Sequence, residues 1–170
     1  YGPQGAQITD AQARQILKRI DNIDIFADVS WLNFASAKKT EYFDFAGDEL
    51  MSEYIDAAMA YALPWTEDEL AAAKALGALS VVYSPLNGAG RMPVQEVLRR
   101  LGVGRIETVK VQEFPDENFS TCPYPNPEKE EAMCEALKLA GKVKPDIVIV
   151  TDPDCDRVGV AVAKNGSYRR

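Results

Sequence analysis

The stretch that most constrains the fold of this chain is DIVIVTDPDCDRVGVAVA, residues 146–163, in which two apolar runs flank an acidic segment. The first run, 147–150, is short and β-branched and does not alternate, which is typical of a strand buried on both faces of a parallel sheet. In the second run, Val158, Val160 and Val162 alternate with small residues. The pattern therefore predicts a strand, an acidic loop and a second strand.

The acidic loop carries Asp152, Asp154 and Asp156 at alternate positions, with Arg157 directly after them. In an extended chain these carboxylates would lie about 6 to 7 Å apart. Oxygens that bind Mg²⁺ lie about 2.0 to 2.1 Å from it, so the three can share one ion only if the loop curls around it. Pro153 favours such a curl. A divalent ion would leave about one surplus negative charge, which Arg157 is placed to offset, unless it holds an anionic group instead.

Three alternatives to a Mg²⁺ site can be compared. An EF-hand calcium loop would need glycine and glutamate where Arg157 and Ala163 stand, so it is excluded. A nucleophilic aspartate that forms an aspartyl phosphate is chemically possible at Asp152. Such a loop normally opens its domain, however, whereas only fourteen residues follow Asp156. A solvated acidic turn is disfavoured because three carboxylates repel one another without a counter-ion.

Composition narrows the classes of function. The chain of 170 residues has 26 acidic and 19 basic side chains, and this charge of −7 argues against nucleic acid or an anionic membrane as a partner. A bound metal ion could still attract a phosphorylated substrate. The absence of histidine excludes a histidine base, nucleophile or metal ligand. An odd number of cysteines predicts a reducing, cytoplasmic location without structural disulfides, and we expect Cys155 to turn away from the ion.

From residue 64 onward the predicted elements alternate regularly. They are a helix that Thr66 and Glu69 open as a capping box, a strand at 79–83, a helix from Pro93 to Gly102, a strand at 107–114, a helix capped by Asn126 with Pro127 in its first turn and Gly141 at its end, and a strand at 146–151. This order predicts an α/β fold, a three-layer α/β/α domain with a mainly parallel mixed sheet. Residues 158–163 would return antiparallel. Ligands of such sheets gather beyond the carboxyl ends of the strands, where the aspartates fall.

The first 63 residues are expected to be a helical remnant of a neighbouring domain plus a connecting helix. Thr9 and Asp10 would cap a first helix, and the aromatic segment 24–47 is predicted as a connection with short strand pairing. A second helix would end near Pro64. Its stripe of Met51, Tyr54, Ile55 and Ala58 is predicted to pack in a core. The chain thus looks like an excerpt of a longer polypeptide, in which 64–170 form one complete domain.

Gly88 and Gly90 follow the predicted strand at 79–83. They do not form a dinucleotide fingerprint, because Pro93 stands at the third glycine position. A tight strand-to-helix turn explains them, and the helix that follows could attract an anion to its N-terminus.

TDPDCDR, together with three other stretches, resembles the α-D-phosphohexomutase family, the phosphoglucomutases and phosphomannomutases. The family has an acidic metal loop of the form D-x-D-x-D-R. YSPLNGAG at 83–90 is similar to its T-P-L-H-G-x-G turn, although Asn87 stands where many members have histidine. PNPE at 125–128 and YGPQGAQI at 1–8 match two further stretches in the same order.

The resemblance implies a mutase cycle in which a phosphoserine phosphorylates a hexose 1- or 6-phosphate and takes back the other phosphoryl group from the bisphosphate. It implies that Asp152, Asp154 and Asp156 bind Mg²⁺ and that Arg157 is a catalytic contact to phosphate. The family serine, in a T-A-S-H-N-P context, would lie upstream of Tyr1. We therefore expect a fragment that is inactive alone and that binds hexose phosphate only with its missing domains, with no obligate protein partner indicated. Two alternatives stay open: a free-standing metal-binding or interaction module, and a phosphatase that uses Asp152.

Overall fold

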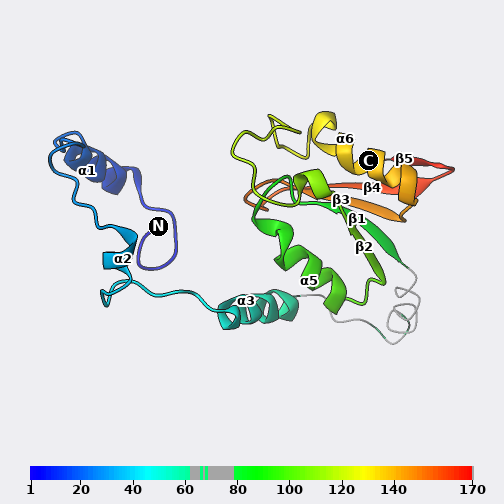
Figure 1. The fold of residues 1–170 in the computed structure, drawn as a ribbon, viewed down its shortest axis with the longest axis horizontal. Coiled ribbons are helices and arrows are strands. Elements are labelled where there is room, and N and C mark those ends of the chain that lie inside the picture. Colours follow the sequence, from blue (N-terminus) through cyan, green and yellow to red (C-terminus); the bar gives the residue numbers. More distant parts are fainter. Residues whose placement is uncertain (62–65, 67, 69–78, 170) are drawn as a thin grey trace. The chain divides into compact units, whose positions relative to one another are not determined.

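The computed structural model describes residues 1–61, 66, 68 and 79–169. Within these residues the chain forms a five-stranded mixed sheet (Figure 1). The strands lie in the order β2 (Arg105–Thr108), β1 (Ser80–Ser84), β3 (Ile147–Thr151), β4 (Val158–Lys164) and β5 (Ser167–Arg169). β1 pairs in parallel with β2 and β3, whereas β4 pairs antiparallel with β3 and β5. The predicted parallel strands and the returning antiparallel strand are confirmed. The short β5 was not predicted.

Helices α5 (Pro93–Arg100) and α6 (Glu130–Val143) lie on opposite sides of the sheet, which gives the predicted three layers (Figure 1). α6 buries one face against β1, β3 and β4. The fully buried members of this core include Ala132, Met133, Ala136 and Ala140 of α6 and Val82, Val148 and Val150 of the sheet. The spacing of the helical members is three or four residues, as expected for one face of a helix.

The small residues of β4 face α6, and the large ones face the other side of the sheet. A Cβ added to Gly159 would lie 2.9 Å from the Met133 sulfur and 2.9 Å from the Pro127 carbonyl oxygen, so no larger residue fits there. Val158, Val160 and Val162 are 61%, 42% and 45% exposed, respectively. Small residues alternate with valines in β4 because α6 and the segment before it approach one face of the strand closely.

The predicted strand at 107–114 is wrong in its bounds, because β2 begins at Arg105 and ends at Thr108. Its partner β1 ends at Ser84, one residue beyond the partner of Thr108, so β1 offers no pairing for most of the predicted strand. The chain turns instead into a short 3-10 helix, Lys110–Gln112. This turn carries the Gln112 side chain into the interior, where it is 1% exposed.

The predicted start of α6 is also wrong, because the helix begins three residues later than Pro127. Asn126 caps a turn rather than the helix: its side-chain oxygen accepts the Glu128 N–H at 2.9 Å, and its carbonyl oxygen accepts the Lys129 N–H. Lys129 is the residue that precedes the first helical turn. Pro127 is buried in the approach to β4.

The two helix ends that were assigned to glycine behave differently. Gly102 follows α5 with a left-handed φ of 89°, a conformation that glycine adopts without strain, so this prediction is confirmed. Gly141, in contrast, lies within α6, which continues to Val143. Lys144 closes the helix in the left-handed conformation, with φ 52°.

The chain divides into two compact units, 1–46 and 47–170. In the first unit, α1 (Asp10–Ile20) is confirmed, with Thr9 and Gln12 forming a capping box. Where short strand pairing was predicted, the structure has a helical turn, α2 (Phe34–Ala37), which Asn33 caps through its side chain. The prediction of strands is therefore wrong within 24–47, where the Asn33 cap favours a helical turn.

Helix α3 (Asp48–Ala60) belongs to the second unit and ends before the predicted Pro64. Only Ile55 of its described residues is buried, while Met51 and Tyr54 are 37% and 61% exposed. Ala58 is exposed as well, so the predicted core stripe is wrong for these three side chains, and α3 packs mainly against α5. The helix predicted to open at Thr66 lies outside the described residues.

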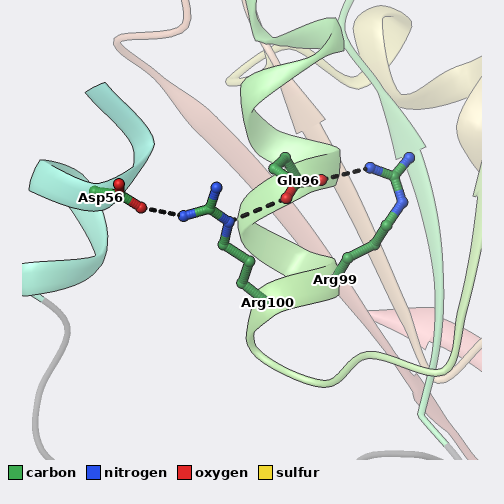
Figure 2. A network of polar contacts seen from close by, with 4 residues as sticks. All are labelled: Asp56, Glu96, Arg99 and Arg100. Carbon is green, nitrogen blue, oxygen red and sulfur yellow. Dashed lines mark hydrogen bonds and ion pairs between the residues drawn. The ribbon is translucent and has the colours of Figure 1, made fainter. Parts of the chain in front are cut away.

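One ion pair links α3 to α5, and two more lie within α5 (Figure 2). The Arg100 guanidinium bonds Asp56 of α3 and, at 3.0 Å, Glu96 of its own helix. Arg99 bonds the other oxygen of Glu96 at 3.1 Å. These side chains are partly exposed, so each pair contributes little to stability. No helix in the described part of the chain is long and apolar enough to cross a membrane.

Candidate metal centre

The acidic loop, residues 152–157, connects the carboxyl end of β3 to the start of β4. β3 lies in the middle of the sheet, beside the parallel strand β1. Parallel neighbours end at the same edge of a sheet, so the segment that follows β1 lies next to the acidic loop. The loop is therefore at the edge where α/β sheets bind their ligands.

The backbone of the loop curls back on itself, as a shared ion requires. Asp152 donates its N–H to the Arg157 carbonyl at 3.3 Å, and Cys155 donates its N–H to the Asp152 carbonyl at 3.0 Å. Cys155 adopts a left-handed φ of 63°, which reverses the chain direction within the loop. As a result, the carboxylates of Asp152, Asp154 and Asp156 each offer an oxygen within 4.8 Å of the other two.

The three carboxylates differ in their surroundings. Asp152 is 2% exposed, whereas Asp154 and Asp156 are exposed. Burial raises the pKa of Asp152, but the Arg157 N–H, at 3.0 Å, and its other hydrogen bonds hold this pKa below its usual range. The pKa of Asp156 is raised by its hydrogen bond with Asp152, by desolvation and by repulsion from Asp154. The arrangement therefore concentrates negative charge that a cation would relieve.

Arg157 is the cation that contacts these carboxylates. Its Nε lies 3.2 Å from an Asp152 oxygen and 3.3 Å from an Asp156 oxygen, with its side chain 48% exposed. Of the two roles predicted for Arg157, the geometry shows the first, the offset of carboxylate charge. A contact to phosphate stays a prediction.

A divalent ion fits the donor atoms that are present. Among the described residues this is the only group of three or more histidine, cysteine or carboxylate side chains that could hold a metal, and all three donors are carboxylates. Carboxylate oxygens are the ligands of hard cations such as Mg²⁺ and Ca²⁺. Small rotations of the exposed Asp154 and Asp156 side chains would bring their oxygens to a common ion. Asp152 is already fixed.

Sequence reasoning missed two residues that support the loop. The Tyr83 hydroxyl of β1 and the Thr151 hydroxyl of β3 form a buried hydrogen bond of 2.9 Å. Burial raises the pKa of Tyr83 well above its usual range, so the hydroxyl keeps its proton. Only the pairing of β1 with β3 brings these side chains together, and no spacing in the sequence reveals it.

The Cys155 sulfur lies against Gly90, and all three cysteines are free.

Comparison with known proteins identifies relatives of this fold. The family described as phosphoglucomutase/phosphomannomutase, alpha/beta/alpha domain II, matches residues 52–166, which include the acidic loop. Phosphoglucomutases of Staphylococcus aureus strains MRSA252 and USA300 are each 41% identical over 83 residues, which are 49% of this chain and 15% of the relative. The chain therefore spans a small part of the length of these relatives.

A solved structure supports the fold independently. The chain is similar to a Thermus thermophilus protein described as a putative phosphomannomutase, with a TM-score of 0.52 and 23% sequence identity. The similarity covers 70% of this chain and 25% of that protein. At this identity the likeness shows the fold alone.

Proposed function

Because the chain belongs to the phosphoglucomutase/phosphomannomutase family, we propose that it carries the metal-binding domain of a hexose-phosphate mutase. The observation that supports this proposal most is the curled acidic loop within the matched region, where three carboxylates converge at the carboxyl end of β3. In this proposal the ion is Mg²⁺, and Asp152, Asp154 and Asp156 are its ligands.

The three ligands have different tasks. Asp152 is buried and held by the Arg157 N–H, so it fixes the position of the ion. Asp154 and Asp156 are exposed and can rotate toward it. Bound Mg²⁺ would act as a Lewis acid that stabilises negative charge on a transferring phosphoryl group.

Arg157 takes part in the same site through two separate groups. Its main-chain N–H keeps Asp152 in place, while its guanidinium offsets the charge of Asp152 and Asp156. A bound ion would take over that neutralisation. The half-exposed guanidinium is then available to contact the phosphate of the substrate, which is the catalytic role proposed for Arg157.

The reaction we propose for the parent protein is transfer of a phosphoryl group between C1 and C6 of a hexose phosphate. It passes through a phosphoserine that this chain does not contain, so the chain alone is inactive. Residues 64–170 would be the second mutase domain, and 1–63 the end of the first domain with its connecting helix. The exposed apolar face of α1 supports the second assignment. We also propose a cytoplasmic location.

The test of the metal site is Mg²⁺ binding to the chain, measured by titration calorimetry or by competition with Mn²⁺. We expect weak binding, because the phosphoserine ligand is missing. Asp154→Asn should weaken it at least about tenfold, since it removes one of three charged ligands. Glu117→Gln, which changes an exposed carboxylate in another loop, is the matched control and should bind as the unaltered chain does.

Three results would contradict the proposal. Equal binding by Asp154→Asn and Glu117→Gln would exclude the acidic loop as the site. An aspartyl phosphate at Asp152, or turnover of a phosphate ester by this chain alone, would favour a phosphatase. Tight Mg²⁺ binding that Asp154→Asn abolishes would favour a free-standing metal-binding module.

A further inference from the structure

A turn that contains two glycines lies directly against the acidic loop. We call residues Gly88, Ala89 and Gly90 the glycine turn. Ala89 donates its N–H to the Pro153 carbonyl at 2.8 Å, which joins the turn to the middle of the acidic loop. This bond links two segments that are more than sixty positions apart in the chain.

Both glycines are required by lack of space. A Cβ added to Gly88 would collide with the backbone of Pro153. A Cβ added to Gly90 would lie 2.8 Å from the Cys155 sulfur and 3.0 Å from the Thr151 hydroxyl oxygen. The φ of Gly88 is −110°, which any residue can adopt, so backbone conformation does not demand glycine there. The close approach of the acidic loop does.

The chain segment that leads into the glycine turn is rigid, because several hydrogen bonds hold it from behind. The Asn87 N–H donates to the Gln112 carbonyl at 2.8 Å, and the Asn87 side-chain amide donates to the Phe114 carbonyl at 2.7 Å. Ser84 donates its hydroxyl to the Gln112 side chain at 2.7 Å. Leu86 and Asn87 both have left-handed φ values, 46° and 63°, in buried positions. Such a conformation persists only where the surroundings fix it.

The acidic loop has the opposite character. Its carboxylates repel one another, and two of the three are exposed. Without support, repulsion would favour a loop in which these side chains move apart. Of the two segments in contact, the glycine turn is therefore the one that determines the shape of the other.

We propose that the glycine turn is a template that holds the acidic loop in its metal-binding curl. Gly88 and Gly90 act as positioning residues, since they touch Pro153 and Cys155 and not the ion. Preorganisation of this kind removes the free-energy cost of gathering three carboxylates at the moment of binding. The inference rests on the proposed metal function and adds the element that makes the site ready for the ion.

The first test compares two glycine-to-alanine variants of the whole chain. Gly88→Ala adds a Cβ where the Pro153 backbone lies, whereas Gly141→Ala adds one to an α6 position with nothing within 4 Å. We expect Gly88→Ala to weaken Mg²⁺ binding about tenfold or more and Gly141→Ala to leave it unchanged. Thermal unfolding and near-UV circular dichroism of each variant without metal separate positioning from stability. Gly88→Ala should lose affinity while it is still folded and its near-UV spectrum is unchanged.

A second measurement uses the unaltered chain, so it remains decisive even if Gly88→Ala does not fold. If the Ala89–Pro153 hydrogen bond must be closed for the ion to bind, opening that bond releases the ion. Hydrogen exchange of the Ala89 amide should then slow by about elevenfold at a free Mg²⁺ concentration about ten times the dissociation constant. The Val103 amide, which bonds the Leu98 carbonyl at the end of α5, should exchange at an unchanged rate.

The outcomes separate this inference from the metal site itself. No Mg²⁺ binding by the unaltered chain would overturn the proposed site and the inference together. Mg²⁺ binding with an Ala89 exchange rate that does not respond to the ion would overturn the template alone. Folded Gly88→Ala that binds Mg²⁺ as Gly141→Ala does would have the same meaning.

Discussion

Residues 1–46 and residues 47–170, which we call the sheet domain, use their apolar side chains in opposite ways. No residue in 1–46 is buried, and many of its large apolar side chains are more than half exposed. In the sheet domain, β1 and β3 carry Val82, Val148 and Val150 at 0% exposure. Yet α1 has the more complete local signals, with a capping box at Thr9 and basic residues in its last turn.

The contrast shows that local sequence signals determine where a helix begins, whereas burial determines how stable it is. A capping box specifies where a helix begins, but a short helix gains most of its stability from packing. α1 leaves Ile16, Leu17 and Ile20 about half exposed on one face, at 49%, 56% and 53%. This supports the proposal that residues 1–46 belong to a domain whose core includes other parts of the protein.

The largest expected effect concerns the core beneath α6. Met133→Ala removes a fully buried side chain that packs against Gly159, so it should lower the free energy of unfolding by about 2 to 5 kcal/mol. Met92→Ala, at a methionine that is 52% exposed, is the matched control and should cost less than about 0.5 kcal/mol. Urea unfolding measures both. Equal losses of unfolding free energy in the two variants would mean that Met133 is packed no more tightly than the exposed Met92.

The buried polar network behind the glycine turn should give the next largest effect. Gln112→Leu leaves the buried Ser84 hydroxyl and the Thr121 hydroxyl without their partner, at an expected cost of about 1 to 3 kcal/mol. Gln4→Leu, at an exposed glutamine in 1–46, should change the unfolding of the sheet domain hardly at all. If urea unfolding gave similar losses of free energy for Gln112→Leu and Gln4→Leu, the two regions would not differ in how tightly they are packed.

A smaller effect, which depends on pH, is expected at the start of β1. The Ser80 N–H and hydroxyl both donate to the Asp146 carboxylate at 2.8 Å, and these bonds hold the pKa of Asp146 below its usual range. The folded pKa lies below the unfolded one, so the stabilisation is complete above the unfolded value and is lost as pH falls through the folded value. Asp146→Asn should therefore cost about 0.5 to 1 kcal/mol at about pH 7, allowing for solvent screening.

The pH dependence can be checked by thermal unfolding of both proteins between about pH 7 and pH 2, a range that spans the ordinary carboxyl pKa. The difference between Asp146→Asn and the unaltered chain should shrink as the pH falls. Asp10→Asn, in the first turn of α1, is the control and should leave the unfolding of the sheet domain unchanged at each pH. A constant difference across the range would show that the charge of Asp146 does not contribute.

Periodicity and capping residues were sufficient to predict the elements whose boundaries are set locally. α1 begins where Thr9 caps it, and α5 ends at Arg100, just before Gly102. The errors in the bounds of β2 and α6 arose where a distant segment meets the element. β2 stops at Thr108, whose partner Tyr83 is the second-last residue of β1, and α6 starts late because Pro127 packs against Gly159 of β4. No window of sequence contains both partners of such a contact.

The same distinction holds for the candidate site. The alternate spacing of Asp152, Asp154 and Asp156 predicted that a curl was needed, and the curl is present. That Asp152 is buried while the other two are exposed depends on strand pairing, which spacing does not reveal. The support from Gly88 likewise depends on a contact between segments far apart in the chain.

The smallest effect is expected in α1. Leu17 is 56% exposed, so Leu17→Ala should change the unfolding free energy of the sheet domain by less than about 0.5 kcal/mol. Helicity of α1, followed by backbone chemical shifts, should also be kept, because alanine has a helix propensity at least as high as that of leucine. The matched comparison is Met133→Ala, because both substitutions shorten an apolar side chain of similar size to a methyl group. If Leu17→Ala cost as much as Met133→Ala, residues 1–46 would have to bury this leucine within the chain, and the proposal that its apolar face belongs to another domain core would be wrong.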